Sequence, residues 1–485
     1  MNLPPPGGRS ATGAGLTPNI NPAVDTRGAD VTILSTVITK PNSKEYRAAE
    51  AVVRRLADAG HRALLAGGCV RDLLLEREPK DFDVATDAQT EDVQDIFERV
   101  WLTGRSFGVC RVLQYEETIE VATFRRESDY RDGRRPEHVE FCGEEEDAAR
   151  RDFTINAMFW DPLGDEVIDY VGGRQDLDAR ILRAVGDAIE RFQEDYLRLL
   201  RAVRFASRLD LEIEEGTREA IVELADLVDR LAVERVQQEL RVMLTDERPA
   251  HALRMMDDMG LLKYILPEVD AMHGCEQPEN YHPEGDVFVH TMLAVEKLGA
   301  RPAFPLVMAT LLHDVGKPVA VREAGEPMNF RGHDTIGRDL SRRICERLRM
   351  SNEEVERVSW LVGRHHYFMN AEHMRDSTFK KLFAEPGFEQ LAALHRADAL
   401  ASWGCLEDYD LVMARREELP QEQEELLPEP LVTGHDMIEM GFQPGPMFSR
   451  VLHEVRDAQL DEEVTTRDEA LALARELAVA EGERD

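Results

Sequence analysis

The 485-residue sequence contains no long hydrophobic run and only six scattered cysteines. No segment approaches the ~18 consecutive apolar residues of a membrane span, and the start, MNLPPPGGRSATGAG, lacks the basic and apolar segments of a signal peptide. No CxxC spacing occurs, which argues against zinc sites and disulfide frameworks. Since 43% of the residues are hydrophobic, we expect a globular, cytoplasmic protein of several domains with no membrane partner.

Positive charge is also scarce. Lysine and arginine number 59 against 95 aspartate and glutamate residues, for a net charge of −36. A uniform distribution of this charge would argue against a nucleic-acid partner, because phosphate binding requires cations. Basic residues nevertheless cluster at 125–135 and 198–208, whereas 417–429 is strongly acidic. The composition is therefore compatible with an RNA partner that contacts the basic clusters.

Residues 64–86, LLAGGCVRDLLLEREPKDFDVAT, carry the most informative pattern. A short apolar run ends at Gly67 and Gly68, a predicted helix follows, and a second strand is predicted to carry Asp81 and Asp83. Residues two apart on a strand share a face, so the two carboxylates repel each other unless a cation such as Mg²⁺ lies between them. Glycines before a helix N-terminus let a phosphate approach the backbone closely. The combination predicts phosphoryl or nucleotidyl transfer.

The joint pattern GGxVRDxLL followed by DFD resembles motif A of the class II tRNA nucleotidyltransferase and bacterial poly(A) polymerase superfamily. The resemblance implies that Gly67, Gly68 and Arg71 hold the nucleotide. It also implies that Asp81 and Asp83 are catalytic residues that bind Mg²⁺.

A further carboxylate lies in the predicted strand TIEVATFR, residues 118–125. Alternation places Ile119 and Val121 on one face and Glu120 on the other. A lone acid in such a strand is more often an edge residue. The superfamily has its third catalytic carboxylate in a similar strand, so the resemblance assigns that role to Glu120.

An arginine-rich segment, RRESDYRDGRRPEHVEF, follows this strand. Its composition predicts a surface loop. The matching loop of the superfamily is flexible and helps to switch nucleotide choice, whereas the alternative is an ordinary solvated loop. The candidates for RNA contact are Arg125, Arg131, Arg134 and Arg135.

The next segment, EEEDAARRDFTINAMF, resembles motif B of the superfamily. We predict a helix that begins with the acidic residues and has Arg150, Arg151 and Asp152 at its centre. The resemblance implies that Arg151 contacts the nucleotide and that Asp152 and Asn156 order the ribose side of the pocket. A buried arginine–aspartate pair is the alternative interpretation.

EDYLRLLRAVRFASRLDLEI is predicted to be a helix in which four charged residues recur at the helical spacing of three: Asp195, Arg198, Arg201 and Arg204. A solvated basic face is the ordinary explanation. The resemblance instead implies that Asp195 and Arg198 read the Watson–Crick edge of the incoming base. Cytosine and adenine both present an amine and a ring-nitrogen acceptor there, whereas uracil and guanine present carbonyls, so one carboxylate–guanidinium pair could select both. Arg201 and Arg204 are expected to face phosphates.

Histidines become organised in the second half of the chain. His290, the adjacent His313 and Asp314 at a predicted helix end, and Asp398 resemble the metal-binding set of the HD phosphohydrolase superfamily. Imidazole with carboxylate suits transition metals such as Ni²⁺, Mn²⁺ or Fe²⁺. Further residues could complete a second metal or contact phosphate: His333, His365, His366 and Lys317. The implied substrate is a phosphomonoester or a 2′,3′-cyclic phosphate at an RNA end.

We therefore expect an α+β protein: a small N-terminal head with a mixed β-sheet and flanking helices, then an all-α neck, an HD-type body and a helical tail. The predicted boundaries are 1–43 for a disordered segment, 44–175 for the head, 176–260 for the neck, 261–415 for the HD domain and 416–485 for a tail that could contact tRNA.

The expected function is template-independent, Mg²⁺-dependent addition of CCA to the 3′ end of tRNA from CTP and ATP, without an obligate protein partner. Alternatives are a poly(A) polymerase, an enzyme that adds only CC or only A, and an HD phosphohydrolase whose inactive head binds RNA. Poly(A) polymerases of the superfamily tend to be basic and lack an HD domain. The acidity of this chain and its histidine set therefore favour tRNA as the substrate.

Overall fold

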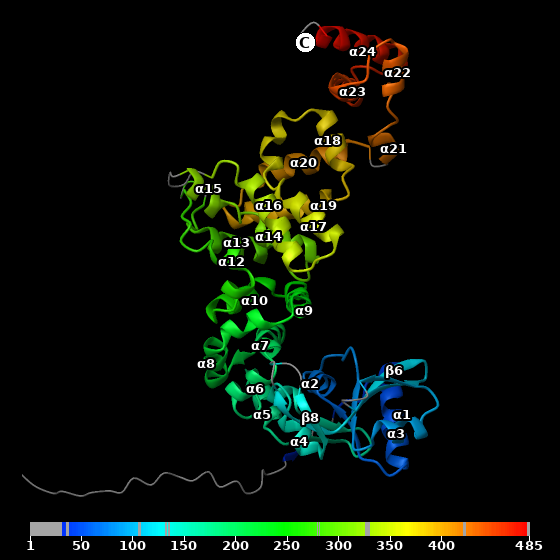
Figure 1. Ribbon diagram of the computed structural model, residues 1–485, viewed down its shortest axis with the longest axis vertical. Helices are drawn as coiled ribbons and strands as arrows, with labels where there is room; N and C mark the ends of the chain where they lie inside the picture. Colours follow the sequence, from blue (N-terminus) through cyan, green and yellow to red (C-terminus); the bar gives the residue numbers. More distant parts are fainter. Residues whose placement is uncertain are drawn as a thin grey trace, which may run out of the picture.

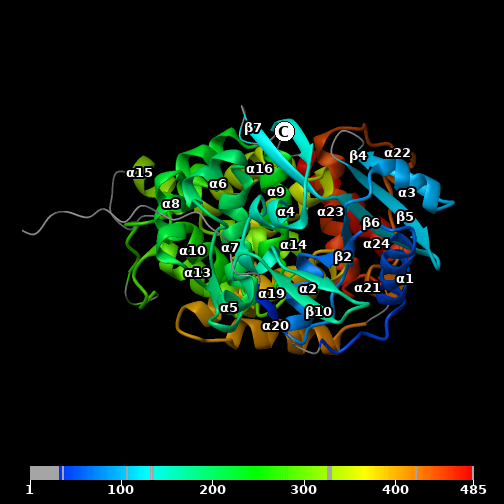
Figure 2. The same cartoon turned by 90° about the horizontal axis from the view of Figure 1, so that it is seen from below.

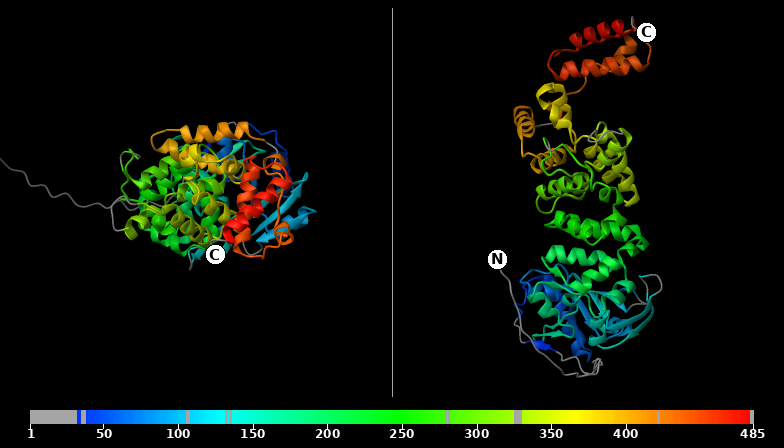
Figure 3. Two further views of the ribbon diagram at one scale, coloured as in Figure 1. Left: turned by 90° about the horizontal axis from the view of Figure 1, so that it is seen from above. Right: turned by 90° about the vertical axis from the view of Figure 1, so that its left-hand side faces the viewer.

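The computed structural model describes residues 32–34, 38–104, 108–130, 133, 136–278, 280, 282–324, 330–420 and 423–482. The molecule is elongated, with the mixed-sheet head at one end and the helical C-terminal tail at the other (Figure 1). Layers of helices lie between them, as the right-hand view of Figure 3 shows. The predicted α+β class, with a small head followed by helices, is confirmed.

An eight-stranded sheet forms the head, in the order β1-β10-β9-β2-β3-β6-β5-β4. Its strands are β1 (Thr32–Leu34), β2 (Ala63–Ala66), β3 (Asp83–Thr86), β4 (Val100–Gly104), β5 (Val109–Gln114), β6 (Glu117–Thr123), β9 (Phe159–Asp161) and β10 (Glu166–Asp169). Strands β3 and β6 pair in parallel, and the other neighbours pair antiparallel. Strand β1 is an element that the analysis of residues 1–43 did not predict.

Short helices flank this sheet: α1 (Lys44–Asp58), α2 (Gly68–Leu74), α3 (Thr90–Ile96), α4 (Glu144–Ala149), η2 (Thr154–Asn156) and α5 (Gly173–Asp178). The amphipathic α1 begins at its N-cap Ser43 and buries Val52 and Leu56 against the sheet. It therefore covers one face of strands β2, β3, β5 and β6, and Figure 2 shows it next to β5 and β6. The opposite face remains available for the charged residues of those strands.

Three local predictions were wrong. The predicted loop after residue 124 is a β-hairpin, β7 (Arg125–Tyr130) with β8 (Pro136–Phe141). Thr90, as an N-cap followed by Glu91 and Asp92, predicts a helix over about 90–100, but α3 ends at Ile96 and the chain extends into β4 from Val100. Helix α4 ends before Arg150, whose guanidinium turns back to Asp147 in the same helix.

The neck is helical apart from the two-stranded pair β11 (Ile181–Leu182) and β12 (Glu212–Ile213). Its helices are α6 (Ala188–Glu194), α7 (Leu197–Leu209), α8 (Glu215–Glu223), η3 (Ala225–Arg230), α9 (Val233–Leu244), α10 (Pro249–Asp258), α11 (Leu262–Ile265) and α12 (Pro267–Asp270). Helix α7 buries Leu199, Leu200 and Val203 and directs Arg198 and Arg201 toward the head. Asp195 lies in the turn before α7, so the prediction of four charged residues on one helix was wrong for it.

The body consists of α13 (Val287–Lys297), α14 (Phe304–Leu312), α15 (Lys317–Ala324), α16 (His333–Arg347), α17 (Asn352–Val362), η4 (Tyr367–His373), α18 (Asp376–Phe383), α19 (Phe388–Ala401) and α20 (Glu407–Glu418). One stretch, Phe304–Val321, has the length and composition of a membrane-crossing helix, but 72% of it is buried in the body. The core helix of a globular protein has the same properties, so this stretch is weak evidence for a membrane span.

A linker with the short α21 (Gln423–Leu426) leads to the tail, formed by α22 (Gly434–Glu439), α23 (Pro446–Leu460) and α24 (Arg467–Gly482). The tail has its own small apolar cluster, which includes Val451, Val455 and Ala474. Helix α18 of the body contacts the end of α23, where Lys380 donates a 2.7 Å hydrogen bond to the carbonyl of Leu460. All six cysteines are free thiols, as their spacing predicted.

Candidate active site

Three carboxylates meet on the open face of the head sheet. Asp83 begins β3 and is the register partner of Glu120 on the parallel strand β6. Asp81 lies two residues before β3, so the prediction that the strand itself carries it was wrong, although Phe82 and Val84 are buried as alternation requires. The pKa of Asp83 is raised to about 6. Burial is the main cause, the charges of Glu120 and Asp81 contribute to the rise, and Arg151 opposes it. Mutual repulsion of this kind is relieved by a divalent cation, so the three residues fit Mg²⁺.

These carboxylates border a hollow of about 700 Å³ between the head and the neck. Its lining includes all thirteen residues predicted to be catalytic or nucleotide-binding: Gly67, Gly68, Arg71, Asp81, Asp83, Glu120, Arg151, Asp152, Asn156, Asp195, Arg198, Arg201 and Arg204. Sequence elements up to 137 positions apart, from residue 67 to residue 204, therefore contribute to one pocket.

The floor of this pocket depends on a glycine. Gly67 has a positive φ of 72°, and a Cβ there would lie 2.8 Å from Nη1 of Arg151. Arg151 in turn donates to Asp147 at 2.9 Å and to the carbonyl of Asn156 at 3.2 Å. The buried Arg71 donates to Asp72 and, at 2.5 Å, to the side-chain oxygen of Asn156. Both guanidinium groups are thus held in place by the protein.

Ion pairs connect the head with the neck at the same place. Arg201 of α7 donates two hydrogen bonds, of 2.8 and 2.5 Å, to Oδ2 of Asp152. Burial raises the pKa of Asp152, but Arg201 outweighs burial and lowers it to about 2. One turn later, Arg204 lies 3.2 Å from the buried Glu239 of α9. Of the two residues predicted to face phosphates, Arg201 therefore also connects the neck to the head, and Arg204 connects α7 to α9 within the neck.

The two residues predicted to read the base have partners of their own. Arg235 of α9 donates to both carboxylate oxygens of Asp195, at 3.1 and 2.8 Å, and the backbone N–H of Leu197 donates to Oδ1. Arg198 donates through Nη1 to Glu194 and to the carbonyl of Arg191, and through Nη2 to the carbonyl of Arg150. Counting partners among the described residues, one lone pair of Asp195 and the Nε and one Nη2 hydrogen of Arg198 remain for a ligand.

The hairpin β7–β8 borders this pocket. Arg125 lines it and donates a 2.6 Å hydrogen bond to Glu127. Arg131, Arg134 and Arg135, the other predicted RNA contacts, lie outside the described residues. Between them, the carbonyl of Gly133 accepts a 3.1 Å hydrogen bond from the backbone of Tyr196, the neighbour of Asp195.

A second chemical centre lies buried in the body. His290 of α13 and His313 at the end of α14 bring their Nε2 atoms within 3.2 Å, and Asp398 of α19 lies 2.9 Å from Nε2 of His290. His290 donates through Nδ1 to Glu284 and His313 through Nδ1 to the carbonyl of Thr310. Each ring therefore directs its Nε2 atom toward the centre, as metal ligands do, and a bound metal would take the place of any proton on that atom.

Asp314 connects this set with three more histidines. Its Oδ2 lies 3.2 Å from Nε2 of His313 and accepts a 2.6 Å bond from Lys317. Its Oδ1 lies 3.5 Å from His333 and 3.8 Å from His365. The two rings are oriented by Nδ1 bonds to backbone carbonyls, and His366 completes a cluster with them.

The chemistry of these groups tests whether they fit metal ions. Oδ1 of Asp314 is buried and has no hydrogen-bond partner among the described residues. Burial lowers the pKa of His290, but hydrogen bonds to Asp398 and Glu284 outweigh it and raise that pKa to about 9. Histidine nitrogens that converge on buried carboxylates, one of which has an oxygen without a partner, fit metal cations. The four predicted ligands fit one ion, and Asp314 with His333, His365 and His366 fits a second.

Three family models match consecutive parts of the chain. They are the poly A polymerase head domain over residues 63–183, the probable RNA and SrmB-binding site of polymerase A over 210–272, and the HD domain over 287–403. The CCA-adding enzyme of Bacillus subtilis strain 168 is 45% identical over 206 residues, which cover 42% of this chain and 52% of the relative. The chain thus spans little more than half the length of the CCA-adding relatives that it matches.

A longer match decides the family. Poly(A) polymerase I of Haemophilus influenzae is 31% identical over 408 residues, which cover 78% of this chain and 88% of the relative. The chain belongs to the class II CCA-adding enzyme and bacterial poly(A) polymerase superfamily. The predicted family is thereby confirmed.

Solved structures of the superfamily agree with the fold. The CCA-adding enzyme of Bacillus stearothermophilus in complex with CTP is 27% identical, with a TM-score of 0.67, and the match covers 91% of this chain and 100% of that one. The Thermotoga maritima CCA-adding enzyme complexed with tRNA has a TM-score of 0.58 at 18% identity, with 92% of this chain and 98% of that one covered. At that identity the second likeness concerns the fold alone.

Sequence reasoning missed three residues that support these sites: Arg235, Glu239 and Glu284. Arg235 and Glu239 lie on α9, 40 and 35 positions after their partners Asp195 and Arg204. Only the packing of α7 against α9 brings them together, and no local spacing signals it. Glu284 precedes His290 by six positions, a spacing that does not predict a contact across a loop.

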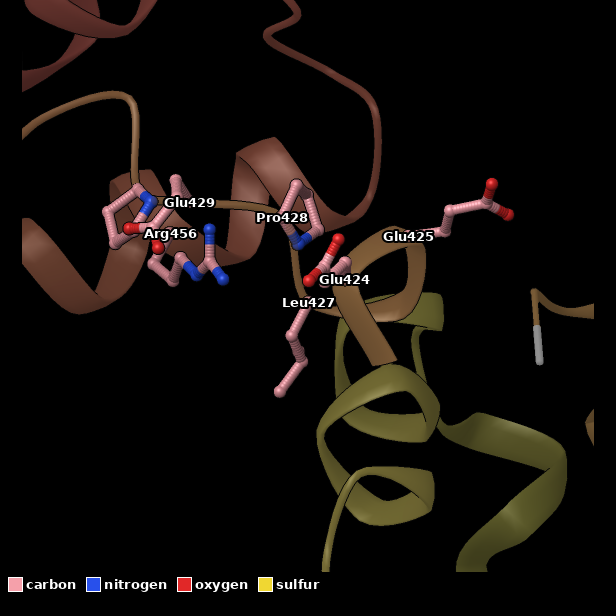
Figure 4. Close-up of a pocket in the computed structure, with 7 residues that line it drawn as sticks. Glu424, Glu425, Leu427, Pro428, Glu429 and Arg456 are labelled. Atoms are coloured by element: carbon pink, nitrogen blue, oxygen red, sulfur yellow. The ribbon is translucent and has the colours of Figure 1, made fainter. Parts of the chain in front are cut away.

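A further hollow lies between the linker and the tail (Figure 4), and it shares no lining residue with either site. Glu424, Glu425 and Glu429 line it, together with Arg456 of α23. A group of acidic side chains at an exposed linker is ordinary solvated surface, and we assign it no role.

Proposed function

We propose that the chain is a tRNA nucleotidyltransferase that adds CCA to RNA 3′ ends from CTP and ATP. The observation that supports this proposal most is the single pocket in which the three carboxylates face the pair Asp195 and Arg198. Chemistry and base selection need to occur within one nucleotide's length of each other, and this pocket brings them that close.

The geometry of Asp195 and Arg198 is suited to cytosine and adenine. The remaining lone pair of Asp195 can accept from an exocyclic amine, and the remaining N–H groups of Arg198 can donate to a ring nitrogen. Arg235 keeps Asp195 ionised and fixes its plane, because it bonds both carboxylate oxygens. Uracil would present a carbonyl oxygen to the carboxylate oxygen of Asp195, and neither can donate a hydrogen bond. An acceptor left unpaired in this way raises the activation free energy, so the rate with UTP should be lower by a large factor.

The head supplies the reacting groups. Asp81, Asp83 and Glu120 would hold Mg²⁺, which when bound assists attack of a 3′-hydroxyl on the α-phosphate and neutralises the pyrophosphate that leaves. Arg151 and Gly67 shape the floor on which the triphosphate would rest. Arg71 and Asn156 would fix the ribose side through their 2.5 Å hydrogen bond.

Two comparisons favour different members of the superfamily. Identity to CCA-adding enzymes reaches 40 to 47% over about 190 to 235 residues. The match to poly(A) polymerase I is lower in identity but longer, so a poly(A) polymerase is the second candidate. We favour CCA addition because the body carries the complete histidine set and the chain is acidic.

We propose a second activity for the body: metal-dependent hydrolysis of a phosphomonoester or 2′,3′-cyclic phosphate at an RNA end. His290, His313, Asp314 and Asp398 would hold a transition metal such as Ni²⁺, Mn²⁺ or Fe²⁺. Six free thiols accord with a cytoplasmic setting for both activities.

The test is single-nucleotide incorporation. Each of the four nucleoside triphosphates is offered alone, with Mg²⁺, to a tRNA lacking its CCA end and to a tRNA ending in CC. We expect C on the first acceptor, A on the second, and neither U nor G on either. Repeated addition of A to both acceptors would replace the proposal by poly(A) polymerase activity, and no incorporation would refute it.

Asp195→Asn with Arg198 intact sharpens this test. An amide can donate where the carboxylate only accepts, so we expect the preference for CTP over UTP to fall by about tenfold or more. Asp210→Asn is the matched control, because Asp210 follows α7 and pairs with Arg248 away from the pocket.

A further inference from the structure

One aromatic ring lies among the arginines of the nucleotide pocket. The ring of Phe205, on α7, has three guanidinium carbons close to its centroid: Arg204 at 4.6 Å, Arg201 at 5.1 Å and Arg71 at 5.2 Å. All four residues line the pocket. A guanidinium within about 6 Å of an aromatic centroid is attracted by the electron-rich face of the ring. Phe205 is therefore a common contact of three cations that repel one another.

The three arginines come from different parts of the chain. Arg71 belongs to α2 of the head, whereas Arg201 and Arg204 belong to α7 of the neck. Phe205 is buried and packs edge-on against Phe153 of the head, with the ring centroids 5.8 Å apart. The core thus holds the ring at the junction of head and neck, where it contacts cations from both sides of the pocket.

Hydrogen bonds hold these guanidinium groups to different degrees. Arg71 and Arg201 each donate two hydrogen bonds to an aspartate oxygen, at 2.5 to 2.8 Å. Arg204 lies 3.2 Å from Glu239, but neither Nε of Arg204 nor Oε2 of Glu239 has a hydrogen-bond partner among the described residues. Arg204 also has the shortest of the three distances to the ring of Phe205. Its orientation should therefore depend most on that ring.

Repulsion among the arginines is measurable in this pocket. Burial and the charge of Arg201 lower the pKa of Arg204 to about 10, against the opposing charge of Glu239. A triphosphate site needs several cations at one place before the ligand arrives, because groups that are already oriented cost no reorganisation when it binds. Attraction to a shared ring reduces the cost of holding those cations together in the empty pocket.

We propose that Phe205 is a positioning residue that orients the three arginines toward the triphosphate and so sets the affinity for the nucleotide, without affecting the choice of base. The proposal rests on the transferase function. Nη1 of Arg201 donates to none of the described residues, so it remains for a phosphate oxygen. The base-reading residue Arg198 is held by Glu194 and by backbone carbonyls instead of the ring. Nucleotide affinity and base selection therefore depend on different contacts.

A purely structural phenylalanine would act through its volume, whereas the proposed role depends on the charge distribution of the ring. Fluorine withdraws electron density from the face of an aromatic ring and adds little volume. Mono-, di- and trifluorinated phenylalanine in place of Phe205 should therefore weaken the attraction of the guanidinium groups stepwise, with the packing against Phe153 retained. This series separates the two explanations.

The experiment uses the full chain with the fluorinated series at position 205, together with Phe205→Tyr and Phe205→Leu. Calorimetry without RNA gives the Kd for CTP with Mg²⁺ and for inorganic tripolyphosphate, which has no base. The values of kcat and KM for CTP and UTP are measured with a tRNA lacking CCA. Phe192→Leu is the control, because Phe192 is a buried phenylalanine of α6 that does not line the pocket.

We expect both Kd values to rise stepwise with fluorination, by about tenfold for the trifluorinated ring and for Phe205→Leu. The KM for CTP should rise in parallel while kcat stays within about twofold, because the lost contact acts on the bound nucleotide and the transition state alike. The preference for CTP over UTP should stay within about twofold. Phe205→Tyr, which keeps an aromatic face, and Phe192→Leu should bind tripolyphosphate within about threefold of the wild type.

Equal Kd values across the fluorinated series would overturn the proposal, even if Phe205→Leu binds poorly, since the volume of the ring would then explain its role. A loss of base preference as large as the loss of affinity would overturn it as well. Wild-type protein whose affinity for CTP falls with fluorination but which transfers no nucleotide would refute the transferase function and leave the role of the ring standing. Wild-type protein that binds neither CTP nor tripolyphosphate would refute both.

Discussion

The two chemical centres of this chain are organised in opposite ways. In the head, three carboxylates lie at a sheet surface, and Glu120 is about half exposed and only loosely paired. In the body, His290, His313 and Asp314 are fully buried, and each histidine ring is fixed by its second nitrogen. Preorganisation by burial suits a site that retains its metal, whereas an open site can be completed by metal and nucleotide together at each turnover.

The same difference appears in how charge is compensated. In the head, burial and the nearby charges of Glu120 and Asp81 raise the pKa of Asp83. The body places lone pairs of histidines against each other around one bridging carboxylate, Asp314. A cation relieves both arrangements, but only the second holds its ligands in place beforehand.

The largest effect is expected from Asp83→Asn. Loss of one shared carboxylate should reduce nucleotide incorporation by about 10³-fold, because the charge that develops at the α-phosphate is no longer compensated. Hydrolysis of 2′,3′-cyclic AMP by the same preparation should stay within about twofold of the wild type. Equal loss of both activities would show that the two centres are not independent.

Asp314→Asn is the converse variant, because it removes a predicted metal ligand of the body and leaves the head unchanged. We expect loss of metal from the body, measured by elemental analysis after gel filtration, together with loss of phosphohydrolase activity. Nucleotide incorporation should remain within about twofold, because the centres lie in separate parts of the molecule. Asp398→Asn provides a second variant, since Asp314 also neutralises the buried Lys317. Retained metal in both variants would contradict the assignment of these ligands.

Much of this organisation could be predicted from the sequence, for an identifiable reason. The alternation around Glu120 and Asp83 is local, so it predicts which side chains share the open face. The positions of Arg235 and Glu284 depend on packing between distant elements, which no local period contains. Asp195 was placed on a helix because its spacing fits one, but its backbone is extended (φ −143°), since the turn before α7 begins there.

A smaller effect distinguishes whether Arg235 acts on Asp195 through the geometry of its two hydrogen bonds or through its charge alone. Arg235→Ala should lower the preference for CTP over UTP by about tenfold, since Asp195 loses the two bonds that fix its plane. Arg235→Lys restores the charge without the bidentate geometry, so it should recover little of that preference. Arg208→Ala is the control, because Arg208 lies on α7 but pairs with Asp246 outside the pocket. A preference that depends on charge alone would be restored by lysine.

The smallest effect concerns stability and pH. The pKa of Asp152 is lowered to about 2 by Arg201, below the ordinary value of about 3.9, so the ionised form stabilises the folded state. This contribution, about 2 kcal/mol, is complete above pH ~4 and is lost as the pH falls toward 2. Urea unfolding of wild type and Asp152→Asn should therefore differ by that amount at pH 7 and by progressively less below pH 4. A difference independent of pH would indicate lost packing instead.

The most direct measurement is the length and sequence of the product formed from a tRNA that lacks CCA, with CTP, ATP and Mg²⁺ present together. We expect three added nucleotides, CCA, and then a stop, with no product from Asp83→Asn. A long adenosine tail, or equal incorporation by wild type and Asp83→Asn, would contradict the assignment of CCA addition to the carboxylates of the head.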